Sequence, residues 1–329
     1  MQRSTFFILI VIVAIFTFSC NEERNIFDPG NLAPKTVDQD SSLPSISVNG
    51  SLFHAETFGN KDSAMIVFLH GGPGGDYRNA LNVKKLADDG YYVIFYDQRG
   101  SGLSQRHPKD SYTGNTLTDD LKAIIHHYKT STNQKVFLFG HSWGAILAGA
   151  YINRYPTEIS GVIFAEPGGF NYQSLVEYGE KTRKLELFGE ATSDALYQDQ
   201  FITGKENEHE ILDYKLNINS SFVFANGNIE GIEGPSPYWR NGAVILKKLS
   251  ELAAKNGYDF TTNLSHYTPK VLFIYGQNNK AYGLEYAKKE AKHFNNSQII
   301  QIDNTGHEMI YFKWNLIYPI ALSYFNSLK

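Results

Sequence analysis

Short apolar runs alternate with segments of helical periodicity in two parts of the chain. Residues 64–69 contain no polar side chain, which is typical of strands buried on both faces of a sheet. Strands that alternate with helices predict a parallel sheet with right-handed crossovers. We expect further strands at 91–96, 136–139, 161–164, 271–275 and 298–302. Helices are expected at 81–88, 117–128, 145–155, 284–294 and near 310–325. At the start, 45–48 and 52–58 alternate weakly and are expected to form an antiparallel pair.

The alternation is lost between residues 168 and 267. This stretch is rich in Tyr, Asn, Glu and Leu, and it offers helix candidates at 172–187 and 243–254 but no buried-strand run. An irregular, largely helical block between two strands of a sheet is typical of a lid. The sequence therefore predicts an α/β core made of 45–167 and 268–329, with 168–267 inserted as a lid.

The first residues have the pattern of a targeting segment. Arg3 precedes the apolar run 6–18, which is too short to span a bilayer comfortably and suits a signal-peptide h-region. Cys20, the only cysteine, follows this run, and residues 16–20 resemble a lipobox; the alternative is an ordinary buried or leftover cysteine. We expect a lipoprotein signal peptide over 1–19, lipidation of Cys20 and a solvated tether over 20–44. This predicts a lipid-anchored protein of a bacterial cell envelope, facing the periplasm or the exterior.

Composition narrows the possible partners. The net charge is only -4 with no basic cluster, which argues against nucleic acid as a partner. A single cysteine rules out an internal disulfide, and no zinc-type spacing of Cys and His is present. We expect neither a cofactor nor a metal, because the serine, histidine and acid considered below suffice for catalysis. The 21 Tyr and 22 Phe could line an apolar pocket or simply fill the core.

A G-x-S-x-G motif lies between an expected strand and an expected helix. It reads Gly140-His141-Ser142-Trp143-Gly144. A serine on so sharp a strand-to-helix turn has a strained backbone and an exposed hydroxyl, and glycines are needed where neighbouring side chains would collide. The Trp143 N–H at the helix N-terminus would then point at a developing oxyanion. A chance match in a glycine-containing turn is the alternative, but the strand and helix around the motif argue against it.

Two further loops should lie at the same edge of the sheet as Ser142. The sequence HGGPGG at 70–75 follows a buried strand, and the amide of Gly72 is the candidate second oxyanion donor. A phosphate cradle is the rival interpretation, but neither G-K-[ST] nor G-x-G-x-x-G is present there. The sequence DQRGSG at 97–102 follows the next strand, and we expect its Asp97 and Arg99 to brace these loops.

These three motifs together resemble the α/β-hydrolase fold, and within it the proline iminopeptidase group of serine peptidases. The resemblance is good from about residue 64 to 164, loose in the C-terminal part and slight in the lid. It implies removal of an N-terminal proline, or another small residue, through an acyl-enzyme. Ser142 would attack the carbonyl, a histidine would carry the proton, and an acid would orient that histidine.

The histidine of this group comes after the last strand, where His307 stands. The usual acid is an aspartate after the strand at 271–275, but Asn279 holds that place. Glu166 lies two residues past the strand at 161–164, as the acid does in some haloalkane dehalogenases of the same fold, so we expect it to be the triad acid. Its alternative role is to grip a substrate amine or brace the lid. Asp303 is a poorer candidate because it lies so close to His307 along the chain.

Substrate choice is expected to depend on the lid. The related peptidases hold the free α-amino group with lid carboxylates, and Glu230 and Glu233 are the candidates. The family's tryptophan-and-glutamate lid signature is not evident. Three function classes therefore remain: an exopeptidase, an esterase or amidase acting on small acyl compounds, and a non-catalytic lipoprotein that Asn279 alone supports.

Overall fold

The computed structural model describes residues 32–182, 208–222 and 228–329. The predicted signal peptide, Cys20 and the first part of the tether lie outside these residues, as does the end of the predicted helix 172–187. Among the helices in the described ranges, none is both long and apolar enough to cross a membrane.

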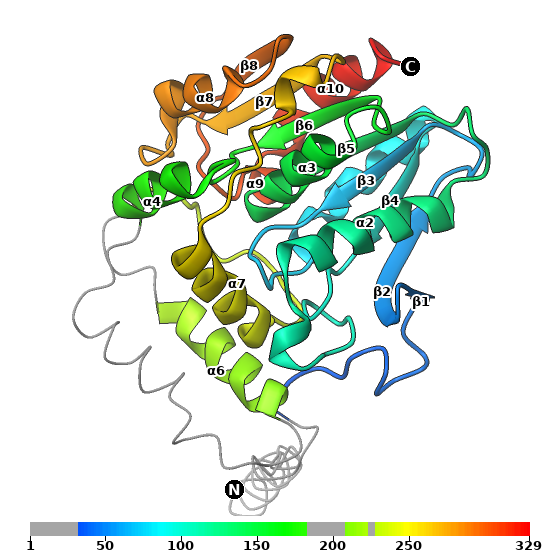
Figure 1. Cartoon of the computed structure of the whole chain (residues 1–329), viewed down its shortest axis with the longest axis vertical. Coiled ribbons are helices and arrows are strands. Elements are labelled where there is room, and N and C mark those ends of the chain that lie inside the picture. Colours follow the sequence, from blue (N-terminus) through cyan, green and yellow to red (C-terminus); the bar gives the residue numbers. More distant parts are fainter. Residues whose placement is uncertain (1–31, 183–207, 223–227) are drawn as a thin grey trace, which may run out of the picture.

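An eight-stranded sheet forms the centre of the molecule (Figure 1). Its order is β1-β2-β4-β3-β5-β6-β7-β8; the β1-β2 and β2-β4 pairs are antiparallel and every other pair is parallel. The mostly parallel sheet and its antiparallel opening are therefore confirmed. The strands are β1 Ser45–Val48, β2 Ser51–Phe58, β3 Met65–Leu69, β4 Tyr92–Tyr96, β5 Val136–His141, β6 Gly161–Ala165, β7 Val271–Gly276 and β8 Ser297–Ile302.

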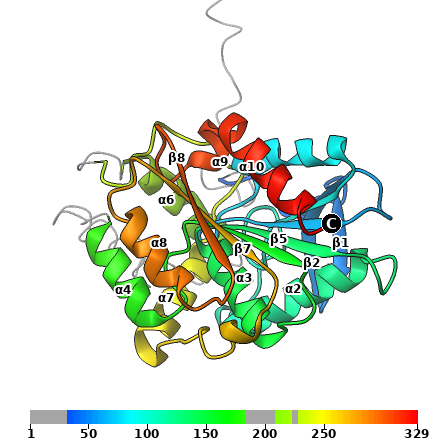
Figure 2. The same cartoon turned by 90° about the horizontal axis from the view of Figure 1, so that it is seen from above.

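Helices cover both faces of the sheet, which explains why its inner strands are almost entirely apolar. Alternate residues of β3 divide between the two cores: Ile66 and Phe68 pack with η1, α9 and α10, whereas Met65 and Val67 pack with α2 and α3. Figure 2 shows α9 and α10 on one face and α2, α3 and α8 on the other. The bounds of these helices are η1 Arg78–Asp89 (a 3-10 helix), α2 Gly114–Tyr128, α3 Trp143–Arg154, α8 Gly283–Ala291, α9 Met309–Phe312 and α10 Trp314–Asn326. The closing helix predicted near 310–325 is therefore divided at Lys313 into α9 and α10. A further 3-10 turn, η2, covers Lys109–Ser111.

A largely helical segment connects β6 to β7, as predicted for the lid. Its described elements are α4 Tyr172–Lys181, α6 Glu208–Phe222, α7 Ala243–Asn256 and the 3-10 turn η5 Leu264–His266. In Figure 1, α6 and α7 lie side by side beyond the edge of the sheet.

A buried ion cluster joins this insertion to the core. Asp213 of α6 is fully buried, and its Oδ2 accepts hydrogen bonds from Nε of Arg106 at 3.0 Å and Nε of Arg240 at 2.7 Å. Its Oδ1 accepts from the N–H of Ala243 at 2.8 Å, the first residue of α7. One carboxylate therefore holds together α6, α7 and the loop that follows β4.

The tether predicted over 20–44 is not solvated along its whole length. Ala33 and Val37 are buried, and the carbonyl of Pro34 accepts a hydrogen bond from Arg240 at 2.7 Å. The N–H of Leu32 donates to the Glu210 carboxylate at 2.7 Å. The prediction fails here because both partners lie in the insertion, about two hundred residues further along the chain.

Replacing Asp213 with alanine is expected to lower the free energy of unfolding by about 3–5 kcal/mol, because two buried guanidinium groups lose their carboxylate. Urea unfolding followed by circular dichroism measures this change. The control is Asp110→Ala, which removes an ion pair with Lys248 from a side chain that is 95% exposed. Equal midpoints for the two variants would show that the cluster contributes no more than a surface pair does.

Candidate active site

Ser142 occupies the turn between β5 and α3 with φ 53° and ψ -119°. A non-glycine residue in such a conformation costs on the order of 1–3 kcal/mol, and such strain gathers at functional sites. The flanking glycines are required by packing: a Cβ on Gly140 would lie 2.5 Å from the carbonyl oxygen of Gly144, and one on Gly144 would lie 2.0 Å from that of Leu69. The strand, strained serine and helix predicted from the motif are confirmed.

Glu166 and His307 meet at the same edge of the sheet. The Nδ1 atom of His307 lies 2.6 Å from Oε2 of Glu166, whose side chain is fully buried. Because a carboxylate oxygen only accepts, Nδ1 carries the proton of the neutral ring, and Nε2 of that neutral ring is left to accept one. This is the relation between histidine and acid that a catalytic triad requires.

Sheet register explains why Glu166 reaches this place. His141 of β5 pairs with Ala165 of β6, and the N–H of Ser142 donates to the carbonyl of Ala165 at 2.8 Å. The nucleophile and the acid therefore follow adjacent strands at equivalent positions. Glu166 also has a left-handed backbone, with φ 48°.

Asn279 supports the acid and does not replace it. Its Nδ2 donates to Oε2 of Glu166 at 2.8 Å, while its Oδ1 accepts from the N–H groups of Ala281 and Tyr282 at 3.1 and 3.2 Å. The N–H of Gly276 donates to the other oxygen of Glu166 at 2.7 Å. Three donors, including His307, thus fix the carboxylate in one orientation.

Asp303 takes no part in this network. Its side chain is exposed and accepts from Nε2 of Gln301 at 2.9 Å. The structure therefore agrees with the sequence argument that ranked Asp303 below Glu166.

Further contacts hold His307 beside the nucleophile. Its carbonyl accepts from Nε2 of His141 at 2.8 Å, its N–H donates to the carbonyl of Glu230 at 2.9 Å, and the rings of His141 and His307 are 4.8 Å apart. Within the described residues, Oγ of Ser142 and Nε2 of His307 are not hydrogen-bonded to each other. Catalytic hydrogen bonds are often long in free enzymes and tighten when substrate binds.

Burial lowers the pKa of His307, but the hydrogen bond and charge of Glu166, with the nearby carboxylates of Glu230 and Glu308, outweigh it. The net effect raises this pKa to about 9. The pKa of His141, whose ring lies beside that of His307, is shifted in the opposite direction: burial and the charge of His307 lower it. His141 therefore acts as a neutral hydrogen-bond donor to the His307 carbonyl.

This pKa predicts the acid limb of the activity profile. Protonated His307 cannot take the serine proton, so kcat/KM should fall as the pH drops through the His307 pKa, with a midpoint above 6.5. Glu308→Gln removes one of the carboxylates that raise this pKa and should move the midpoint down. The exposed Glu285→Gln serves as the control. A wild-type midpoint at or below 6.5 would contradict the assignment.

The loop 70–75 lies against the nucleophile, as expected for an oxyanion loop. A Cβ on Gly71 would be 3.3 Å from that of Ser142, and one on Gly72 would be 2.6 Å from the backbone nitrogens of Gly74 and Gly75. Trp143 is the first residue of α3, where N–H groups have no partner within the helix. The backbone amides of Gly72 and Trp143 are therefore placed on two segments that flank the serine.

Only one of the two predicted lid glutamates reaches the site. Glu230 is buried, its backbone contacts His307, and its carboxylate accepts from the Tyr178 hydroxyl at 3.4 Å. Glu233 is exposed.

Of the two residues expected to brace the loops, Asp97 bonds to their backbone, whereas Arg99 pairs with α2. Arg99 forms a bidentate pair with the Asp120 carboxylate at 2.7 Å. Asp97 accepts from Nδ1 of His54 at 2.8 Å and from the N–H of Leu103 at 2.8 Å. Sequence reasoning missed Gln98 between them, although its place two residues past β4 puts it at the same edge of the sheet as Ser142.

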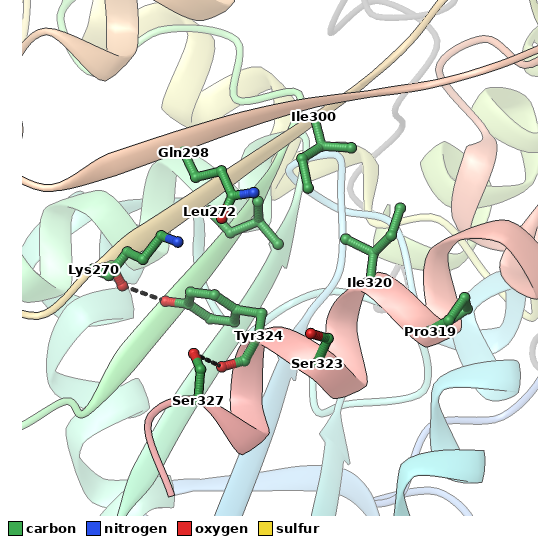
Figure 3. A pocket seen from close by; sticks show the side chains of 9 residues that line it. All are labelled: Lys270, Leu272, Gln298, Ile300, Pro319, Ile320, Ser323, Tyr324 and Ser327. Carbon is green, nitrogen blue, oxygen red and sulfur yellow. Dashed lines mark hydrogen bonds between the residues drawn. The ribbon is translucent and has the colours of Figure 1, made fainter.

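A separate cavity of about 360 Å³ lies between β7, β8 and α10 and contains none of these residues (Figure 3). Within the residues that the structure describes, no group of three or more His, Cys, Asp and Glu side chains is arranged to hold a metal ion.

Comparisons with known proteins agree with the fold described above. A family model for the alpha/beta hydrolase fold matches residues 64–313. AB hydrolase superfamily protein YfhM of Bacillus subtilis is 24% identical over 286 residues, which cover 86% of this chain and 97% of that protein. The proline iminopeptidase of Thermoplasma volcanium is 35% identical over 104 residues, only 32% of this chain and 35% of that enzyme. The crystal structure of proline iminopeptidase from Mycobacterium smegmatis superposes with a TM-score of 0.58 at 16% identity, covering 86% and 97% of the two chains.

Proposed function

The chain belongs to the alpha/beta hydrolase fold family, and on this basis we propose that it is a serine hydrolase that cleaves an amide or peptide bond through an acyl-enzyme. The observation that carries the proposal is the 2.6 Å contact between His307 Nδ1 and Glu166 Oε2, next to a serine on a strained turn. The non-catalytic alternative depended on Asn279, and it loses that support because the Glu166 carboxylate contacts His307 from the neighbouring strand end.

The proposed reaction follows from the positions of these groups. Oγ of Ser142 attacks the substrate carbonyl while Nε2 of His307 takes its proton. The amides of Gly72 and Trp143 donate to the oxyanion of the tetrahedral intermediate. His307 then gives the proton to the departing amine, leaving an acyl-enzyme on Ser142. Water repeats these steps, with His307 as base and then acid, and releases the acid product.

We infer that the substrate has a free N-terminal amine. Glu230 brings a buried carboxylate next to His307, and a dry ammonium group needs such a partner. Proline iminopeptidases among the sequence relatives make an N-terminal proline or another small residue the first candidate. A simple esterase would use the same triad and would not need this carboxylate.

Hydrolysis of proline, alanine and leucine p-nitroanilides beside p-nitrophenyl acetate tests the proposal, using the chain from Asn21 onward. Anilide cleavage that requires Ser142 supports the aminopeptidase function. Ester cleavage alone would favour a carboxylesterase, and no turnover that requires Ser142 would contradict the proposed chemistry.

Glu230→Gln is expected to lower kcat/KM for anilides with a free amine by roughly 30-fold, which corresponds to about 2 kcal/mol for an unpaired buried charge. Ester hydrolysis should change little. The matched control is Glu233→Gln, in the same loop but exposed, which should leave both activities unchanged. Equal losses on ester and anilide would indicate that Glu230 acts through His307 and does not bind the amine.

A further inference from the structure

We propose that Gln98 is a positioning residue that couples the two donors of the oxyanion site. The inference rests on the proposed function, because it concerns the tetrahedral intermediate of that reaction. Gln98 follows β4 and is 1% exposed, so it is not expected to touch substrate. Its amide instead connects the two segments that carry Gly72 and Trp143.

Three hydrogen bonds define its position. The backbone N–H of Gln98 donates to Nε2 of His70 at 2.9 Å, and its side-chain Nε2 donates to the carbonyl of His70 at 3.0 Å. Its Oε1 accepts from the indole Nε1 of Trp143 at 2.9 Å. The donor and acceptor of one buried amide are thus both satisfied, one on each side of the site.

The bonds to His70 determine where the Gly72 N–H points. Nε2 of His70 accepts from the backbone N–H of Gln98, so Nδ1 carries the ring proton. Nδ1 then donates to the carbonyl of Gly71 at 2.8 Å. Burial lowers the pKa of His70, which favours this neutral form. In a trans peptide the C=O of Gly71 and the N–H of Gly72 point in opposite directions. Fixing the carbonyl on the ring therefore turns the amide of Gly72 away from it.

The bond to Trp143 restrains the other donor. Trp143 contributes its backbone N–H at the first position of α3, and its indole is held by Gln98. A rotation of the indole, or a shift of the 70–75 loop, would break a bond to the same amide group. Gln98 therefore keeps the two donors at a constant separation, which preorganised stabilisation of an oxyanion requires.

The test is Gln98→Met, which keeps the side-chain volume and the backbone bond to His70 but removes both side-chain bonds. We expect kcat on the best substrate to fall about tenfold or more, because oxyanion donors are worth on the order of 100-fold each. KM should stay within about threefold. Affinity for an alkyl boronic acid, which forms a tetrahedral adduct with the serine, should fall in parallel with kcat.

Gln134→Met is the matched control. Gln134 is also buried, donates to the carbonyls of Lys61 and Ser63 at 2.8 and 2.6 Å, and precedes β5 at the end of the strand away from Ser142. This variant should lose thermal stability yet keep kcat and boronic acid affinity.

Trp143→Phe removes the indole donor alone, so it tests the same bond even if Gln98→Met does not fold. Its effect should overlap with that of Gln98→Met, and the double variant should lose much less than the product of the two factors. The inference is overturned if boronic acid affinity is unchanged in either single variant, or if Gln134→Met lowers kcat equally. A wild-type protein without serine-dependent hydrolysis would instead overturn the proposed function.

Discussion

Replacing Ser142 with alanine is expected to lower hydrolysis by at least about 10⁴-fold, because the acyl-enzyme cannot form without its oxygen nucleophile. Alanine has the same Cβ as serine, so the positive φ of the turn is no more strained in the variant. Thermal stability should therefore change little. Initial rates on the anilides and the ester, with a melting curve of each protein, measure both quantities.

Ser323→Ala is the control for this experiment, because Ser323 is exposed on α10, away from the sheet edge that carries the site. It should keep wild-type activity. Residual turnover in Ser142→Ala within tenfold of the wild type would show that another group, or activated water, performs the attack.

Glu166→Gln is expected to lower kcat by about 10⁴-fold, the size of effect known when a triad acid becomes an amide. The carboxylate accepts from Gly276 through one oxygen and from Asn279 and His307 through the other. A glutamine has only one acceptor oxygen, so at least one of these donors would face an NH₂ group. His307 would then lose its charge partner or adopt the wrong tautomer.

Two companion variants separate the possible roles of Glu166. Asp303→Asn removes an exposed carboxylate four positions before His307 and should leave kcat unchanged. Asn279→Asp, added to Glu166→Gln, introduces a carboxylate at the position where the resemblance leads one to expect the acid, and it should recover part of the loss. If Glu166→Gln alone stays within tenfold of the wild type on esters but fails on anilides, Glu166 grips the substrate amine and is not the acid.

Local patterns were sufficient for the predictions that involve one element and its neighbours. Strands buried on both faces appear as unbroken apolar runs, so β3 and β7 were found within one residue of their bounds. The turn that carries Ser142 joins a strand to a helix and has glycines where the backbone leaves no room for Cβ. Glu166 could be proposed because parallel strands end at one edge of the sheet, where residues that follow adjacent strands meet.

Contacts between distant segments could not be predicted in this way. Asn279 bonds to Glu166 across 113 positions, and Gln98 bonds to Trp143 across 45. Nothing in either local sequence distinguishes a buried bridging amide from a solvated one. The burial of Val37 was missed for the same reason, since the elements that cover its segment come much later in the chain.

The position of the acid on β6 has a consequence for how such enzymes diversify. Ser142, Glu166 and both oxyanion segments precede the β6–β7 insertion in the chain, and only His307 follows it. A change in the length of the insertion therefore leaves the spacing of nucleophile and acid along the chain unaltered. A foreign insertion must still replace the bond from the His307 N–H to the Glu230 carbonyl and the bond from the Gly242 N–H to the Gly74 carbonyl. Because the Glu230 carboxylate also raises the pKa of His307, exchanging this segment would alter substrate preference and the pH dependence of the reaction together.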